Sequence, residues 1–328
     1  MKQLIMEGPC KSRVIQVEIP KINDDQILVK VVYTGMCHSE FYPWKTAKAG
    51  DEFGHETVGV VADKGRNVKD FKIGDRVTGL GGGGYKEYIV MEPEKVMLVP
   101  DNIKDEDAIV EPLACMMSVA ERIDTGFVGD TIAVVGTGYM GLGMVSLFKA
   151  RGYENIIAVD EREIALENAK RYGATEAYLP SQLPENYILD WNTWNKPDLK
   201  RDGHITDIFN TGLKTVVEFS GTPSGLKLAG DMVCAHGTLG IAGFHNDTTR
   251  TLDLKLWGMK AISMFNCHER RIDYEVTLCR RALGLISSGQ WKFTGAATHI
   301  YTLEEFDKGN YDMENHTDNF IKGIVKCC

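Results

Sequence analysis

The stretch TIAVVGTGYMGLGMVSLFKA, residues 131–150, decides which kind of fold this chain can form. It predicts a short strand, a turn with glycines in the spacing GxGxxG at Gly136, Gly138 and Gly141, and a helix over 140–151. In such a unit the first glycine permits the tight turn, the second lets the backbone approach a pyrophosphate, and the third lets helix and strand pack closely. The N-terminus of the helix faces the phosphate charge. The stretch therefore predicts a dinucleotide-binding turn.

A carboxylate follows this turn at a suitable distance for the ribose. Asp160 closes the next apolar run, IIAVD, 19 residues after Gly141, where it can accept hydrogen bonds from the adenine ribose hydroxyls. A carboxylate there would repel a 2′-phosphate, which favours NAD over NADP. Arg162 argues against this choice, but as a first-turn helix residue it is expected to point to solvent. The predicted cofactor-binding residues are Gly136, Gly138, Tyr139, Met140, Gly141 and Asp160.

The regions on either side of the turn differ in their secondary-structure pattern. The first 100 residues contain short β-branched runs, with strands expected at 14–19, 26–33, 57–62 and 85–91. From about residue 120, apolar strands and helical stretches alternate, which implies parallel strands joined by crossover helices. The polar and aromatic segment 180–210 is expected to be a loop insertion within this second part. The chain is therefore predicted to be an α/β protein with an additional β-rich domain.

Length and composition indicate a soluble globular protein of two domains, with 328 residues, 43% of them apolar and 25% charged. A net charge of −9 disfavours nucleic acids and anionic membranes as partners, because both would repel the chain. Residues 131–148 carry no charge, but their four glycines favour the strand–turn–helix unit over a membrane span. Since the first residues do not form a signal peptide, a cytoplasmic location and eight reduced cysteines are expected.

Two short segments contain the residue types of a metal site. They are GMCHSE at 35–40 and GHE at 54–56. A cysteine, a histidine and carboxylates form a borderline-soft ligand set that suits Zn²⁺ better than Mg²⁺ or Ca²⁺. Catalytic zinc keeps one position open for substrate, so three protein ligands are enough. Taken alone, Cys37 or His55 would more often be a packing residue.

At these residues the chain resembles the zinc-containing medium-chain dehydrogenase/reductase family, to which alcohol and sorbitol dehydrogenases belong. The shared features extend over nearly the whole chain and include GHE at 54–56 followed by Gly59, Gly65 and Val68, the turn GDRV at 74–77, and VVEFSG at 216–221. The resemblance implies a β-rich GroES-like catalytic domain, residues 1–119 and 267–328, and a Rossmann domain with a doubly wound parallel sheet, residues 120–266. It also implies a homodimer or homotetramer.

The family pattern implies roles for particular residues. Cys37 and His55 would be zinc ligands, and Glu56 would lie in or just outside the coordination shell. Glu111 matches the position where sorbitol-type members have a glutamate that binds zinc directly or through water, although an acid at a helix start is the alternative. The implied reaction oxidises a secondary alcohol of a polyol or sugar-like substrate to a ketone. Zinc favours the alkoxide, Ser39 passes the proton outward, and hydride goes to NAD.

The chain departs from the family pattern in three places. The four closely spaced cysteines that hold a second, structural zinc are missing from 65–111, so one zinc per chain is expected. Tyr42 replaces the relay histidine of many alcohol dehydrogenases, five residues after the cysteine. The segment 265–270 replaces an Arg-Tyr pair near the substrate of sorbitol-type members, which implies a different substrate. We expect Asn266 and His268 to face that substrate, with a helix-start cluster as the alternative.

Two other classes of protein remain open at this point. A zinc-free quinone or enone reductase of the same superfamily would keep the glycine turn, but it does not need Cys37, His55 and Glu111 together. A non-catalytic NAD-binding protein would have no reason to carry a complete ligand set. Metal analysis of the purified protein distinguishes all three.

Overall fold

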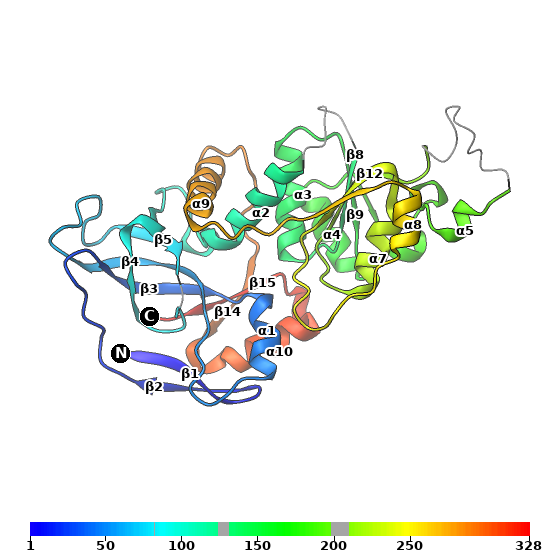
Figure 1. The fold of residues 1–328 in the computed structure, drawn as a ribbon. Coiled ribbons are helices and arrows are strands. Elements are labelled where there is room, and N and C mark those ends of the chain that lie inside the picture. Colours follow the sequence, from blue (N-terminus) through cyan, green and yellow to red (C-terminus); the bar gives the residue numbers. More distant parts are fainter. Residues whose placement is uncertain (82, 124–130, 198–209) are drawn as a thin grey trace. The chain divides into compact units, whose positions relative to one another are not determined.

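The computed structural model describes residues 1–81, 83–123, 131–197 and 210–328 (Figure 1). They form two compact units: unit 1 is Met1–Met117 with Arg270–Cys328, and unit 2 is Ser118–Glu269. The boundaries expected from the sequence, after 119 and 266, differ from these by two and three residues. Within the described ranges, no helix has the length and apolar character needed to cross a membrane.

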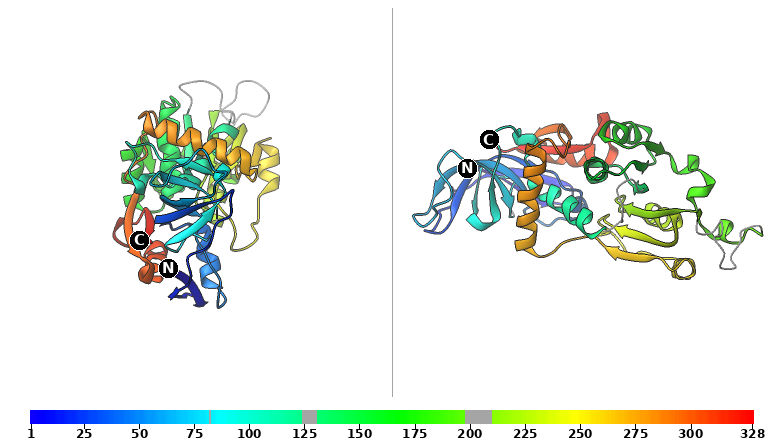
Figure 2. Two further views of the ribbon diagram at one scale, coloured as in Figure 1. Left: turned by 90° about the vertical axis from the view of Figure 1, so that its left-hand side faces the viewer. Right: turned by 90° about the horizontal axis from the view of Figure 1, so that it is seen from above.

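Unit 1 contains a seven-stranded sheet in the order β14-β15-β3-β4-β5-β7, with β6 also paired to β3. The strands are β3 (Ile27–Gly35), β4 (Glu56–Lys64), β5 (Arg76–Leu80), β6 (Tyr88–Met91), β7 (Val96–Leu98), β14 (Ala297–Thr302) and β15 (Lys322–Lys326). The unit also holds the hairpin β1 (Lys2–Gly8) and β2 (Lys11–Gln16), helices α1 (Phe41–Lys45), α9 (Ile272–Ser287) and α10 (Phe306–Asn315), and the start of α2 (Val110–Arg122). The C-terminal strand β15 lies beside β3, as Figure 1 and Figure 2 show.

The core of unit 1 follows from the alternating pattern of β3. Ile27, Val29 and Val31 are fully buried in one apolar cluster, whereas Lys30 between them is exposed. Burying one such aliphatic side chain contributes about 1.5–3 kcal/mol. Helix α10 adds Phe306 to the same cluster, so the C-terminal part of the chain stabilises the N-terminal sheet. This packing fixes the end of β3, from which the next loop begins.

Unit 2 is a six-stranded, fully parallel sheet in the order β10-β9-β8-β11-β12-β13. The strands are β8 (Thr131–Val135), β9 (Asn155–Val159), β10 (Glu176–Tyr178), β11 (Leu213–Glu218), β12 (Val233–Ile241) and β13 (Ser263–Asn266). The helices are α3 (Tyr139–Ala150), α4 (Glu163–Tyr172), α5 (Trp191–Trp194), α7 (Pro223–Met232) and α8 (Leu254–Met259). The strand order reverses between β8 and β11, and ligands of such sheets bind at the carboxyl ends there. The predicted fold class is confirmed.

The segment after β10 is irregular in backbone, as expected, but its side chains belong to the core. Leu189 is fully buried and Trp194 nearly so, both in the apolar cluster of unit 2. Lys260, which is also fully buried, donates hydrogen bonds from Nζ to the carbonyl oxygens of Gly230 at 2.7 Å and Leu189 at 3.1 Å. The segment 180–197 is thus a loop insertion whose side chains pack into the core of unit 2, which the sequence did not predict, and 198–209 lie outside the described residues.

The buried lysine makes stability depend on pH. Burial lowers the pKa of Lys260 to about 8, from the ordinary lysine value of 10.5. Between these values the unfolded chain binds a proton that the folded chain does not, so stability rises with pH. We expect the free energy of unfolding of the wild type, measured against Lys260→Met, to rise by roughly 2–3 kcal/mol from pH 8 to 10.5. Urea unfolding across this range checks it, with the exposed Lys255→Met as control; a flat difference would contradict it.

Candidate metal centre and cofactor site

Cys37 and His55 meet because strands β3 and β4 pair as antiparallel neighbours. Thr34 lies opposite Thr57, so the residues after β3 and those before β4 lie at the same end of the pair. The possible ligand atoms of Cys37, His55 and Glu56 all lie within 4.8 Å of one another. In the part of the chain that the structure describes, no other three His, Cys, Asp or Glu residues form such a group. The structure thus brings three of the four predicted metal residues together.

His55 is oriented by a carboxylate to which sequence reasoning gave no role. Its Nδ1 lies 2.7 Å from Oε1 of Glu40, and the same oxygen accepts a hydrogen bond from the Gly54 amide at 2.7 Å. Tyr85 donates its hydroxyl proton to the other oxygen of Glu40 at 3.2 Å. Burial alone would lower the pKa of His55, but the Cys37 sulfur and the Glu40 carboxylate raise it to about 12. With Nδ1 engaged, Nε2 is the nitrogen left for a metal.

Glu56 is a buried carboxylate that makes an ion pair through one oxygen only. Its Oε2 lies 2.6 Å from Nζ of Lys322, and both side chains are almost completely buried. Neither oxygen accepts a hydrogen bond from any described residue, so Oε1 has no partner among them. An unpaired buried carboxylate oxygen is costly unless a further group binds it. A soft sulfur, an imidazole nitrogen and this oxygen together form a donor set that fits zinc.

Glu111 lies near this group without belonging to it. It stands in the first turn of α2, and Cys115 donates its thiol proton to Oε1 of Glu111 at 3.6 Å. Burial and, to a smaller extent, the nearby Glu56 carboxylate raise the pKa of Glu111 to about 7, so the two carboxylates share one electrostatic environment. The carboxylate of Glu111 is not among the atoms gathered within 4.8 Å.

Ser39 lies directly against the predicted zinc ligand Cys37. Its hydroxyl donates a hydrogen bond to the sulfur of Cys37 at 3.1 Å. Tyr42, at the position of the relay histidine, lies on the surface of α1 with 45% of its area exposed. The hydroxyl of Ser39 therefore lies beside one of the candidate metal ligands, and the side chain of Tyr42 is exposed to solvent.

The glycine turn in unit 2 has the geometry that a dinucleotide needs. Gly136 has φ +90°, and a Cβ there would lie 2.5 Å from the backbone nitrogen of Ser220. A Cβ at Gly141 would overlap the carbonyl oxygen of Gly136. At Gly138, by contrast, no described atom lies within 4 Å of an added Cβ. Helix α3 begins at Tyr139 with Gly138 as its N-cap, and the first amides of a helix, which lack partners within it, favour a bound anion such as phosphate.

Asp160 is already engaged by two neighbours. Its Oδ2 accepts a hydrogen bond from the Thr137 amide at 2.8 Å, and Nε of Arg162 donates to its Oδ1 at 3.1 Å. The expectation that Arg162 points to solvent was wrong, because this residue is the N-cap of α4 and its side chain folds back on Asp160. The guanidinium offsets the carboxylate charge, which weakens the electrostatic argument against a 2′-phosphate.

The two predicted substrate residues lie at the carboxyl end of β13. Oδ1 of Asn266 accepts a hydrogen bond from the His268 amide at 2.9 Å, which is a local turn. The ring of His268 packs edge-on against Phe244, with ring centres 5.5 Å apart. The end of β13 is on the same edge of the parallel sheet as the glycine turn. The side-chain oxygen of Asn266 is thus used locally.

A buried network at this edge was not predicted. Glu218 ends β11 and is fully buried; its carboxylate accepts from the Ser220 hydroxyl at 2.6 Å and lies 3.0 Å from Nε2 of His245. Arg250 donates to Nδ1 of His245 at 2.8 Å. Burial alone would raise the pKa of Glu218, but His245 and Ser220 lower it. The network joins the loops after β11 and β12, and the first of these touches Gly136.

Breaking this network is expected to weaken cofactor binding without touching the metal. His245→Ala leaves Glu218 without its ring partner and frees the loop that holds Arg250. We expect the Kd for NAD to rise about tenfold, which corresponds to about 1.4 kcal/mol, with zinc content unchanged. Equilibrium fluorescence titration with NAD measures it, and His236→Ala, an exposed histidine of the same unit, is the control. An unchanged Kd would show that the loops hold their places without the network.

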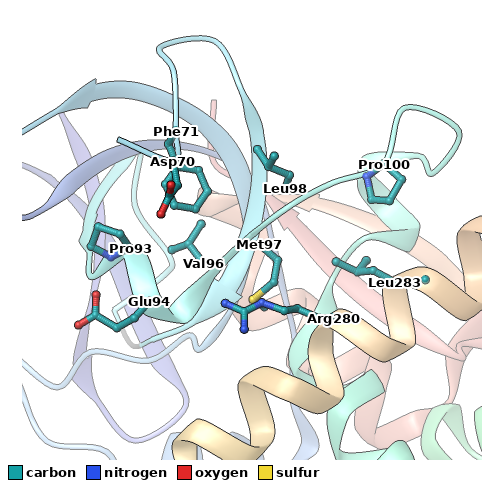
Figure 3. Close-up of a pocket in the computed structure, with 11 residues that line it drawn as sticks. Asp70, Phe71, Pro93, Glu94, Val96, Met97, Leu98, Pro100, Arg280 and Leu283 are labelled. Carbon is teal, nitrogen blue, oxygen red and sulfur yellow. The ribbon is translucent and has the colours of Figure 1, made fainter. Parts of the chain in front are cut away.

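Unit 1 also has a surface cavity of about 720 Å³, between β7 and α9 (Figure 3). Its lining includes the apolar residues Val96, Met97 and Leu283 and the charged residues Asp70 and Arg280. None of the predicted site residues lines it. The predicted metal chemistry therefore lies elsewhere in this unit.

Comparison with known proteins defines the class. Residues 23–101 match the family described as "Alcohol dehydrogenase GroES-like domain", and residues 140–282 match "Zinc-binding dehydrogenase". Sorbitol dehydrogenase of Bacillus subtilis is 26% identical, covering 93% of this chain and 91% of the relative. L-threonine 3-dehydrogenase of Chromobacterium violaceum is 25% identical, covering 89% and 90%. The crystal structure of galactitol-1-phosphate dehydrogenase from Escherichia coli is similar in fold, with a TM-score of 0.80, 19% identity, and coverage of 99% and 100%.

The chain belongs to the zinc-type medium-chain dehydrogenase family. It is an oxidoreductase that acts on alcohols. The family predicted from the sequence is confirmed.

Proposed function

We propose that this protein is a zinc-dependent dehydrogenase that oxidises a secondary alcohol of a polyol or sugar-like substrate to a ketone, with NAD as the hydride acceptor. The observation that carries the proposal is the convergence of Cys37, His55 and Glu56 within 4.8 Å. Both relatives support a secondary alcohol as substrate, because sorbitol and L-threonine carry secondary hydroxyl groups, and the sorbitol dehydrogenase supports the polyol class.

In this proposal Cys37, His55 and Glu56 would hold the metal through Sγ, Nε2 and Oε1, and the carboxylate of Glu111 would lie near them. When bound, zinc supplies Lewis acidity that favours loss of the substrate hydroxyl proton. Glu40 keeps the His55 ring in one orientation, through the 2.7 Å contact to Nδ1. The hydroxyl of Ser39, which lies beside Cys37, carries the proton outward toward the surface.

The nucleotide is proposed to lie on the glycine turn, with its pyrophosphate at Gly138 and the first amides of α3. NAD, when bound, accepts the hydride. Asp160 is proposed to accept hydrogen bonds from the adenine ribose, for which it must share its oxygens with Thr137 and Arg162. NAD remains the proposed cofactor, and the Asp160–Arg162 ion pair is the feature that would allow NADP.

A substrate panel tests the proposed reaction. Purified protein is mixed with NAD or NADP and with polyols, sugars, amino alcohols and simple primary alcohols, and the absorbance of the reduced cofactor is followed. The proposal predicts the fastest reduction with NAD and a polyol or sugar-like alcohol. Fastest turnover of a primary alcohol or an amino alcohol would contradict the substrate class. Reduction of quinones or enones by metal-free protein would favour the zinc-free reductase.

A further inference from the structure

Lys322 is a buried cation beside the predicted metal ligands. No sequence motif predicts a lysine at this place. It begins β15, which lies beside β3, and its side chain is 7% exposed. Its Nζ lies 2.6 Å from Oε2 of Glu56, so the two side chains form a buried ion pair.

The surroundings of Glu56 make its two oxygens unequal. Neither oxygen accepts a hydrogen bond from a described residue, but Oε2 forms an ion pair with Nζ of Lys322 at 2.6 Å. On the side of Oε2 lies Gly35, where a Cβ would overlap that oxygen. The carboxylate is thus held by one oxygen in a space that admits only glycine opposite it, and a single oxygen is left for a cation. An ammonium group paired with Glu56 competes with a dication for that carboxylate.

We propose that Lys322 is a positioning residue that holds Glu56 by Oε2, restricts it to a weak one-oxygen contact with the metal, and so keeps a metal position open for the substrate. This inference rests on the proposed zinc site. Without the lysine, Glu56 becomes a full anionic ligand, the metal is bound more tightly, and the open position is filled.

The test compares Lys322→Met with Lys326→Met, a control on the same strand whose side chain is exposed. Zinc affinity is measured by competition with a chromophoric chelator, and imidazole is titrated into Co²⁺-loaded protein while its visible absorption is recorded. Lys322→Met is expected to bind zinc about tenfold more tightly, the lower end of typical effects of groups behind metal ligands. The imidazole concentration that gives half of the spectral change in the cobalt protein should be at least tenfold higher for this variant, whereas wild type and control should have the same value. Unchanged affinity and an unchanged imidazole response would overturn the inference.

A second pair of variants keeps the test decisive if Lys322→Met does not fold. Glu56→Gln and the double variant Glu56→Gln/Lys322→Met lack the buried carboxylate charge. If the lysine acts through Glu56, their zinc affinities agree within about twofold, since coupled residues give non-additive effects. A tenfold difference between them would overturn the inference. If the wild-type protein itself binds no zinc, the proposed zinc-dependent function is wrong. That result differs from unchanged zinc affinities in the Lys322 variants, which would contradict only the role of Lys322.

Discussion

Cys37→Ser is expected to remove the bound zinc and to lower kcat/KM for the alcohol by about 1000-fold, or roughly 4 kcal/mol of transition-state stabilisation. The sulfur is the one soft ligand in the group, and a serine oxygen cannot replace a thiolate at neutral pH. Ser39 also loses the sulfur to which it donates. Elemental analysis and steady-state kinetics on the same preparation measure both effects.

Cys10→Ser is the matched control, because Cys10 is an exposed free cysteine of the same unit. It should keep the zinc content and the kinetics of the wild type. A Cys37→Ser protein that retains zinc and has kcat/KM within a factor of ten of the wild type would return Cys37 to a packing role.

Alanine at Gly136 is expected to lower the stability of the protein, whereas alanine at Gly138 is expected to lower its affinity for NAD. Gly136→Ala places a Cβ 2.5 Å from the Ser220 backbone at φ +90°, so unit 2 should lose several kcal/mol of stability, about 2–3 or more. Gly138→Ala meets no described atom within 4 Å, so the fold should keep its stability. The new methyl group instead stands where the pyrophosphate must approach, and we expect the Kd for NAD to rise about 100-fold.

Thermal unfolding and NAD titration of the two variants separate the effects. Gly258→Ala is the control, because its Cβ also meets open space, in α8 and away from the glycine turn. It should change neither quantity. If Gly138→Ala binds NAD as tightly as the wild type, the nucleotide does not bind at this turn.

The parts that were predictable from the sequence are those that a short stretch determines by itself. The strand β8 and the turn to α3 follow from apolar residues and three glycines within one run of chain. Cys37, His55 and Glu56 could be proposed together because each lies in a short distinctive segment, and the pairing of β3 with β4 brings the segments side by side.

The parts that were not predictable depend on contacts between distant segments. Lys322 lies in an ordinary apolar strand, and only the pairing of β15 with β3 carries it to Glu56. Glu218 and His245 belong to different loops that meet only when β11 and β12 lie side by side. Arg162 was expected to point to solvent because it was assigned to the first turn of the helix, whereas it is the N-cap of α4. Helix starts predicted from sequence are uncertain by one or two residues, and a shift of one residue changes the direction of the side chain.

The zinc content of the purified protein tests the central claim most directly. Elemental analysis is expected to give one zinc per chain, and removal of that zinc by a chelator should abolish NAD-linked alcohol oxidation until zinc is returned. This follows from the single group of possible ligands among the described residues, at Cys37, His55 and Glu56, and from the absence of any cysteine in 65–111. Full activity in protein without zinc, or two tightly bound zinc ions per chain, would contradict the account.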